Sequence, residues 1–191
     1  MGDVGGPPLR ASQTLPGRLQ HALNHRRRVS LAREGAIACA VLVPLVDIGD
    51  GYGVLYTVRS QHLPNHKGQV AFPGGKRSAL EDTSLRDTAL REAHEEIDLR
   101  REDVELLGEL DDVYTMATDF VITPVVGVLG ASARYSPNPA EVDAVFTVSF
   151  RDLMDPALRG KEAREWKSDR FNLPQKSAPA VSSNTDLTPL N

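Results

Sequence analysis

The sequence contains one cysteine, Cys39, in 191 residues. A single cysteine excludes a disulfide within the chain and the cysteine sets that hold structural zinc. The sequence also lacks an apolar run near the roughly 18 residues of a membrane span, and its first residues lack the apolar core of a secretion signal. We therefore expect an intracellular, cytoplasmic protein that does not insert into a membrane.

Positive charge is not in excess either. The chain has 22 Lys and Arg against 26 Asp and Glu, which gives a formal net charge of −4. This balance argues against a nucleic-acid-binding protein that acts through bulk electrostatics. The final residues, Thr-Pro-Leu-Asn, differ from a peroxisomal targeting tripeptide, so no peroxisomal location is predicted.

The residues that are present suit one globular domain. Apolar residues make up 40% of the chain and charged residues 25%, which is enough to build a core with a solvated surface. Residues 1–14 are rich in Gly, Pro and small polar groups, and residues 174–191 are rich in Ser, Thr and Pro. We predict disordered segments at 1–14 and 174–191 around a domain at 15–173.

Hydrophobic patterns within this domain indicate several strands and a few helices. Apolar or alternating runs predict strands at residues 36–46, 52–58, 104–110, 113–114, 120–129 and 142–150. Residues 151–158 favour a short helix, and a stronger helix is centred on residues 88–97. Strands interleaved with helices predict an α/β sandwich with a mixed central sheet.

A further helix is predicted near residues 16–28, where Leu19 and Leu23 are one turn apart. It ends in the basic run His25-Arg-Arg-Arg28. We interpret this run as a solvated helix end that complements the helix dipole. Contact with an anionic substrate or partner is the alternative.

The central helix has one narrow apolar stripe and one acidic face. Leu85, Ala89, Ala93 and Ile97 recur every four residues, and the two alanines allow close approach to a sheet. On the polar side lie a guanidinium and three carboxylates, those of Arg91, Glu92, Glu95 and Glu96. Carboxylates at this spacing repel one another, so the face is either simply solvated or a place for a cation.

The turn before this helix favours a cation. Phe72-Pro-Gly-Gly75 forms a turn in which the backbone can approach a ligand without an intervening side chain. Such a turn beside a carboxylate-rich helix is an oxygen-rich corner of the kind that Mg²⁺ requires. A diphosphate group would share the metal ions.

These residues resemble the Nudix box, G-x5-E-x7-R-E-U-x-E-E-x-G-U, where U is apolar. The matching positions are Gly75, Glu81, Arg91, Glu92, Ala93, Glu95, Glu96 and Leu99. Two positions depart from the pattern. Nine residues separate Glu81 from Arg91, so Asp82 is an alternative to Glu81 as the partner of Arg91. The late glycine is Asp98, which is less comfortable than Gly in the left-handed region and is expected to cost stability rather than chemistry.

The preceding loop resembles the coenzyme A pyrophosphatase branch of the same family. The resemblance lies in Thr57-Val-Arg-Ser60, followed by Gly68-x3-Phe-Pro-Gly-Gly75. It implies substrate contacts by Arg59, His66, Lys67 and Gly74. The branch often carries an arginine inside the loop, where this sequence has Pro64. His66 and Lys67 are the candidates to supply that charge.

The resemblance implies a Nudix-like α/β/α sandwich and a hydrolase that depends on Mg²⁺ or Mn²⁺. Its small-molecule substrate would be a diphosphate, coenzyme A or an acyl derivative, cleaved to 3′,5′-ADP and 4′-phosphopantetheine. Metal ligands would be the Gly75 carbonyl, Glu92, Glu95 and Glu96, with Arg91 orienting them. The general base stays open between a box glutamate such as Glu92 or Glu95 and the later Glu141. Alternatives are another nucleoside diphosphate substrate, such as a nucleotide sugar or dinucleotide, and a binding module without turnover.

The C-terminal part departs from the same branch. Its members usually close with a further strand and a helix introduced by a Trp-Gly pair, whereas Trp166 and Phe171 lie earlier and no such pair follows. A missing helix would remove several kcal/mol of apolar burial at about 25 cal/mol per Å². A truncated variant, a homodimer that covers the gap, and marginal stability are the three expectations.

Overall fold

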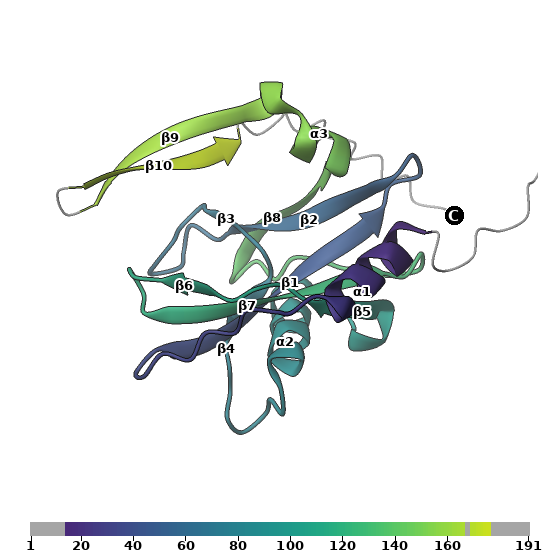
Figure 1. Cartoon of the computed structure of the whole chain (residues 1–191), viewed down its shortest axis with the longest axis horizontal. Helices are drawn as coiled ribbons and strands as arrows, with labels where there is room; N and C mark the ends of the chain where they lie inside the picture. Colours follow the sequence, from purple (N-terminus) through teal and green to yellow (C-terminus); the bar gives the residue numbers. More distant parts are fainter. Residues whose placement is uncertain (1–13, 167–168, 177–191) are drawn as a thin grey trace, which may run out of the picture. The chain divides into compact units, whose positions relative to one another are not determined.

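The computed structural model describes residues 14–166 and 169–176. It consists of two compact units, one that ends at Ser149 and one that begins at Phe150, and each is described by itself. Figure 1 shows the strands and helices of both. No helix among the described residues combines the length and the apolar character needed to cross a bilayer.

The first unit is built on a mixed sheet of eight strands. These are β1 (Ile37–Asp47), β2 (Tyr52–Arg59), β3 (Val70–Ala71), β4 (Gly74–Lys76), β5 (Val104–Glu109), β6 (Val113–Thr115), β7 (Phe120–Leu129) and β8 (Val142–Ser149). The central order is β3-β2-β1-β7-β5, with β4 on β1, β6 on β7 and β8 on β2. Strands β1 and β7 run parallel, and the other pairs between described strands are antiparallel. The predicted strands and the mixed sheet are confirmed.

The sheet forks along one edge of β1. Residues 39–41 of β1 pair with β4, whereas residues 45–47 pair with β2. Between the two pairings lies Pro44, which has no N–H to donate to either strand. The Leu42 N–H, two residues earlier on the same edge, donates to Pro73 O at 2.8 Å. The fork thus places the Pro73-Gly74-Gly75 turn next to the central strand β1.

Helix α2 (Leu85–Ile97) covers one face of this sheet. Ser84 caps its N-terminus by accepting from Asp87 N at 3.2 Å. The predicted stripe is confirmed, because Ala89, Ala93 and Ile97 are fully buried and belong to one apolar cluster with Ala40 and Leu42 of β1. The helix ends at Asp98, which is left-handed with φ 52° as the box pattern predicted, and whose N–H donates to His94 O at 2.8 Å.

Helix α1 (Leu15–His25) lies against β5 on the opposite face. A Cβ atom at Gly108 would come 2.8 Å from Leu23 Cβ, so this glycine allows the close approach. Gly108 pairs with Val126, and alternation along β7 places Val126 on the face opposite Val125, which packs in the α2 cluster. Helices on both faces of a mixed sheet confirm the predicted α/β/α sandwich.

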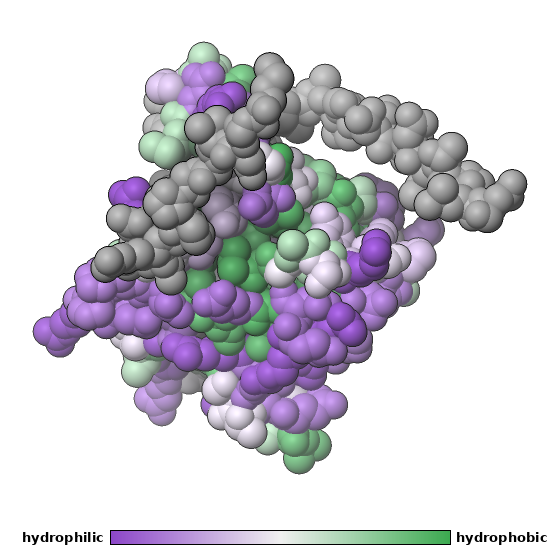
Figure 2. Space-filling view, turned by 90° about the vertical axis from the view of Figure 1, so that its right-hand side faces the viewer, coloured by the Kyte–Doolittle hydropathy of each residue, from purple (hydrophilic) through white to green (hydrophobic). Residues whose placement is uncertain are grey.

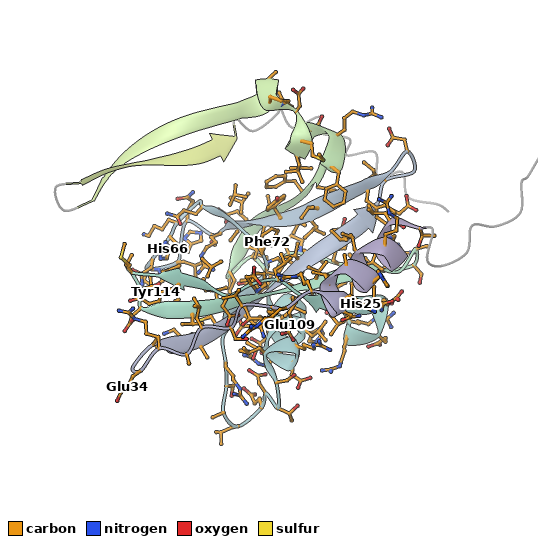
Figure 3. All side chains as sticks on the ribbon, viewed as in Figure 1. His25, Glu34, His66, Phe72, Glu109 and Tyr114 are labelled. Carbon is orange, nitrogen blue, oxygen red and sulfur yellow. The ribbon has the colours of Figure 1, made fainter. Side chains whose placement is uncertain are left out.

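The basic run after α1 was interpreted as a solvated helix end, and for two of its arginines that interpretation is wrong. Arg26 pairs with Asp111 at 2.6 Å, and Arg28 pairs with Glu109 at 2.8 Å and with Asp112. Arg27 is exposed. Figure 3 labels His25 at the end of α1 and Glu109 at the end of β5, on two elements that contact each other. The run therefore ties the segment after α1 to the sheet.

The remaining elements are short. A 3-10 helix, η2 (Arg101–Asp103), precedes β5 in the first unit. The second unit contains α3 (Phe150–Met154), the 3-10 helix η3 (Pro156–Leu158) and an antiparallel hairpin of β9 (Arg159–Trp166) and β10 (Asp169–Lys176). The predicted tail at 174–191 thus begins inside β10, and residues 177–191 lie outside the described residues, as do residues 1–13.

The surface of the molecule carries mainly polar side chains in the view of Figure 2, with hydrophobic residues visible between them. The apolar cluster under α2 is one part of the buried core. Its members from the sheet include Leu55, Val125, Leu129 and Val142, each at most 6% exposed. The core therefore fixes α2 on the sheet, and with it the acidic face of that helix.

Candidate active site

Arg91 resolves the choice that the altered box spacing left open, and its partner is Asp82. Arg91 Nε donates to Asp82 Oδ1 at 2.9 Å and Nη2 to Oδ2 at 3.1 Å. Asp82 also accepts from Ser78 N at 2.7 Å and from Thr88 Oγ1 at 2.9 Å. The hydrogen bond from Arg91 lowers the pKa of this buried carboxyl despite its burial. Glu81 is exposed.

The same guanidinium reaches the β4 backbone and two glutamates. Arg91 Nη2 donates to Lys76 O at 3.0 Å and to Glu92 Oε1 at 2.9 Å, and Nη1 donates to Glu95 Oε2 at 3.0 Å. One rigid planar group therefore links the loop before α2, the strand after the glycine turn and the acidic face of the helix. This arrangement agrees with the orienting role that the box implies for Arg91.

Glu92 lies directly over the glycine turn. A Cβ atom added to Gly75 would be 2.4 Å from Glu92 Oε2, so a side chain at position 75 would displace the carboxylate. Burial raises the pKa of Glu92, and the charge of Arg91 opposes that shift. The turn thus leaves no side chain between its backbone and a partly desolvated carboxylate.

Glu96 is more deeply enclosed and has weaker partners. It is 4% exposed, accepts from Gly74 N at 3.3 Å and has Arg59 Nη1 3.7 Å from its Oε1. Burial is the largest of the effects that raise its pKa to about 7. Among the described residues, the Nε of Arg59 is buried without a hydrogen-bond partner. The structure therefore brings Gly74 and Arg59 of the loop signature together with Glu96 of the box.

Glu95 differs from its two neighbours. Its side chain is 48% exposed, and both of its carboxylate oxygens accept from Arg91. In this arrangement no group of three Asp, Glu, His or Cys residues within 14–166 and 169–176 is placed to hold a metal ion. The donor set still fits a hard cation: all of its ligand atoms are oxygens, the missing side chain at Gly75 leaves room for the Glu92 carboxylate against the turn, and burial raises the pKa of both Glu92 and Glu96.

Glu141 joins the same corner from the other side. Its carbonyl accepts from Ser60 N at 2.8 Å, one residue after Arg59. Its negative charge is among the causes that raise the pKa of both Glu92 and Glu96. The structure thus places this candidate general base within electrostatic reach of the box glutamates.

His66 and Lys67 lie in the loop between β2 and β3, and both are exposed. His66 has φ 57°, and its Nδ1 is 3.0 Å from Gln69 Oε1 of the same loop. Figure 3 labels His66 in this loop and Phe72 beyond β3. The structure shows contacts to the box glutamates for Arg59 but, among the described contacts, only a loop contact for His66.

Sequence reasoning missed Asn138. Asn138 contacts the last turn of α2 through its backbone and its side chain. An asparagine between two prolines, three residues before Glu141, was the available signal.

Comparisons with known proteins agree with this geometry. A sequence model of the NUDIX domain matches residues 38–170. Nudix hydrolase 3 of Caenorhabditis elegans is 38% identical over 156 residues, which cover 80% of this chain and 63% of that protein. An uncharacterized Nudix hydrolase, NudL, of Enterobacter sp. is 41% identical over 137 residues, which cover 68% of this chain and 70% of that protein. The peroxisomal coenzyme A diphosphatase NUDT7 of Mus musculus is 42% identical over 119 residues, which cover 62% of this chain and 50% of that protein.

Solved structures show the same fold. A C. elegans Ap4A hydrolase superposes with a TM-score of 0.51 at 17% identity, covering 62% of this chain and 84% of its own. RenU, a Nudix hydrolase from M. smegmatis, superposes with a TM-score of 0.50 at 21% identity, covering 66% of this chain and 75% of its own. The first unit is thus an α/β/α sandwich in which a glycine turn lies next to an acidic helix. The chain belongs to the Nudix family.

Proposed function

We propose that this protein is a divalent-metal-dependent hydrolase that cleaves the diphosphate linkage of coenzyme A or an acyl-coenzyme A. The products would be 3′,5′-ADP and 4′-phosphopantetheine or its acyl form. The observation that carries the proposal is the corner formed by Gly75, Glu92 and Glu96, where carboxylates are buried with too little positive charge around them. Such a corner suits a cation that a diphosphate can share.

The metal ligands in this proposal are Glu92, Glu95, Glu96 and the Gly75 carbonyl. A bound Mg²⁺ or Mn²⁺ offsets the charge of the diphosphate and makes the attacking water more acidic. Arg91 holds Glu92 and Glu95 on one side of the corner and Lys76 O on the other. Because Arg91 is itself fixed by Asp82, the loop before α2 determines where the ligands lie.

Glu141 is the proposed general base, and a box glutamate such as Glu92 or Glu95 is the alternative. Glu141 lies in the segment before β8 and is not one of the proposed metal ligands, so it can accept a proton from the attacking water while those ligands stay in place. A glutamate that already holds a cation is a weaker base, because the cation stabilises its charged form. This difference in basicity favours Glu141 as the general base.

Arg59 supports the choice of a coenzyme A substrate. Its guanidinium lies 3.7 Å from Glu96 and its side chain is 29% exposed, so it can donate to a phosphate oxygen bound beside that glutamate. The loop signature around it resembles the coenzyme A pyrophosphatase branch, and one relative is named a coenzyme A diphosphatase. Gly74, His66 and Lys67 are the other proposed substrate contacts.

A substrate panel tests the proposal. Purified protein is incubated with coenzyme A, acetyl-coenzyme A, a nucleotide sugar and a dinucleotide, each with Mg²⁺ or Mn²⁺, and the products are separated by chromatography. We expect 3′,5′-ADP and the matching pantetheine phosphate from the first two substrates. Cleavage of the nucleotide sugar or dinucleotide alone would favour the other substrate class, and binding without any cleavage would favour a module without turnover.

A single substitution sharpens the substrate assignment. Arg59→Ala should lower kcat/KM for coenzyme A about tenfold more than for a nucleotide sugar, because one charge-assisted contact to phosphate is lost. Arg27→Ala removes an exposed arginine in the run after α1 and serves as the matched control, with no effect expected on either substrate. Equal losses on both substrates would make Arg59 a structural partner of Glu96.

A further inference from the structure

The segment between β7 and β8 is fastened to the C-terminal end of α2. Ser136 N donates to Ile97 O at 2.8 Å, and Asn138 N donates to Glu96 O at 2.8 Å. These carbonyls belong to the last turn of the helix, where no intrahelical donor remains for them. The segment therefore replaces water as the partner of the helix end that carries Glu95 and Glu96.

The side chain of Asn138 makes one bond to the helix and one to its own turn. Nδ2 donates to Glu95 O at 3.3 Å, while Oδ1 accepts from Ala140 N at 3.2 Å. The Asn138 carbonyl accepts from Glu141 N at 2.9 Å and from Val142 N at 2.8 Å. An amide is suited to this position because it offers a donor and an acceptor at once. Asn138 thereby connects the helix end directly to the backbone of Glu141.

The far side of Glu141 is fastened as well. Its carbonyl accepts from Ser60 N at 2.8 Å, and Asp143 Oδ2 accepts from Gln61 N at 3.1 Å. Ser60 is fully buried and begins the loop between β2 and β3. Glu141 is therefore held between α2 and this loop, and its position depends on bonds at both ends of a short turn.

We propose that Asn138 is a positioning residue that sets the Glu141 carboxylate against Glu92 and Glu96 by tying its turn to the last turn of α2. This inference rests on the proposed function, because it assigns Glu141 the role of general base. A displacement of about 1 Å in a catalytic group can lower turnover about a hundredfold. The role is therefore measurable in kcat, although Asn138 itself touches no substrate.

A double-mutant cycle tests the inference, with the turnover of coenzyme A in the presence of Mg²⁺ as the measurement. Asn138→Ala keeps the backbone bonds and removes both side-chain bonds, so we expect kcat to fall about tenfold or more with KM within about twofold. In a Glu141→Gln background the same substitution should cost less than about twofold, because the group it positions is no longer a base. Asn24→Ala, on the exposed side of α1, is the control for an asparagine without such contacts.

A second measurement does not depend on turnover. In the parent, added Mn²⁺ should broaden the backbone amide signals of Gly75 and Glu141 in an NMR spectrum, because both lie beside the bound ion. Asn138→Ala should retain the broadening at Gly75 and measurably reduce it at Glu141. If circular dichroism shows that the alanine variant is unfolded, Asn138→Ser replaces it, since a serine oxygen can still accept from Ala140 N.

The two proposals fail in different ways. Equal losses of kcat in both backgrounds, a loss confined to KM, or unchanged broadening at Glu141 would each overturn the positioning role. A parent that binds Mn²⁺ and broadens both signals but hydrolyses no diphosphate would overturn the proposed function alone.

Discussion

Two clusters of charged residues in the first unit contain the same residue types but differ in how their arginines and carboxylates are paired. The brace, as we call the first, joins the segment after α1, and Arg86 of α2, to the residues at and just after the end of β5. It consists of Arg26, Arg28, Arg86, Glu109, Asp111 and Asp112. The second is the corner of the candidate active site. Its charged residues are Arg59, Arg91, Asp82, Glu92, Glu95, Glu96 and Glu141. In the brace every arginine has a carboxylate within 2.8 Å. In the corner two arginines face five carboxylates, and Glu96 has its nearest guanidinium nitrogen at 3.7 Å.

The titration of the carboxyl groups follows this difference. In the brace, hydrogen bonds from Val29 N and Arg26 lower the pKa of Asp111. In the corner, burial raises the pKa of Glu92, and it raises that of Glu96 to about 7. Balanced charge therefore identifies a contact that stabilises the fold, whereas buried and unbalanced negative charge identifies a place for a cation. Changing the charge of the corner, or removing its cation, should lower turnover. Changing the charge of the brace should instead lower stability and leave turnover unchanged.

The largest expected effect is the loss of all activity on removal of divalent cations. Exhaustive chelation should abolish hydrolysis, and Mg²⁺ or Mn²⁺ should restore it, because the ligands are oxygens. The corner should also be stabilised by the ion, by about 2.7 kcal/mol at a concentration 100 times the dissociation constant. Thermal unfolding with and without Mg²⁺ measures that gain. Hydrolysis that survives chelation would exclude the proposed mechanism.

The second effect separates catalysis from stability within the corner. Glu96→Gln keeps the size of the side chain and an acceptor for Gly74 N, but removes one ligand charge. We expect kcat to fall at least about a hundredfold, roughly 2.7 kcal/mol in the barrier. The melting temperature of the metal-free protein should be equal or higher, because a buried charge is gone.

Glu105→Gln, on an exposed position of β5, is the matched control for this substitution. It should leave both turnover and melting temperature unchanged. A Glu96→Gln variant as fast as the parent would make the acidic face of α2 a solvated surface, and the metal ligands would have to be sought elsewhere.

The third effect is a loss of stability, and it is expected when the charge of the brace is changed. Asp112 accepts from Arg28, from Thr123 Oγ1 at 2.6 Å and from Leu31 N at 2.8 Å, with its side chain 5% exposed. Asp112→Asn loses a charge and turns an N–H group toward these donors, so the free energy of unfolding should fall by about 2 kcal/mol. Urea denaturation measures this loss, while kcat per folded molecule should not change.

Glu34→Gln provides the comparison for the brace, since Glu34 is exposed in the loop before β1, where Figure 3 labels it. Its unfolding free energy should match that of the parent. If Asp112→Asn were as stable as the parent, the ion pairs of the brace would contribute no more than ordinary surface pairs.

Local patterns in the sequence were sufficient for most of the sheet and for α2 in the first unit, but not for the β9–β10 hairpin, part of which was predicted to be disordered. The apolar and alternating runs predicted the strands, the stripe from Leu85 to Ile97 predicted the buried face of α2, and the box glycine position predicted the left-handed backbone at Asp98. Each of these features depends on residues within a few positions of one another. Family resemblance added the α/β/α arrangement of the layers.

Features that depend on distant contacts could not be predicted in the same way. The basic run after α1 finds its partners more than 80 positions later, and nothing near Arg26 or Arg28 announces them. Asp82 rather than Glu81 faces Arg91 because Ser78 N and Thr88 Oγ1 hold its carboxylate, which requires the path of the inserted loop. The roles of Glu95 and Glu141 stay predictions until they are tested by substitution.

The loop between β2 and β3 is closed at its base, where Arg59 N donates to Gln69 O at 3.0 Å and Gly68 N donates to Arg59 O at 2.9 Å. Lengthening such a loop costs only about 0.6 kcal/mol for each doubling, because the closing bonds stay the same. Insertions there leave the register of β2 and the carboxylates of α2 untouched. If the proposed function holds, substrate preference can therefore change through this one loop while the carboxylates of the corner stay in place.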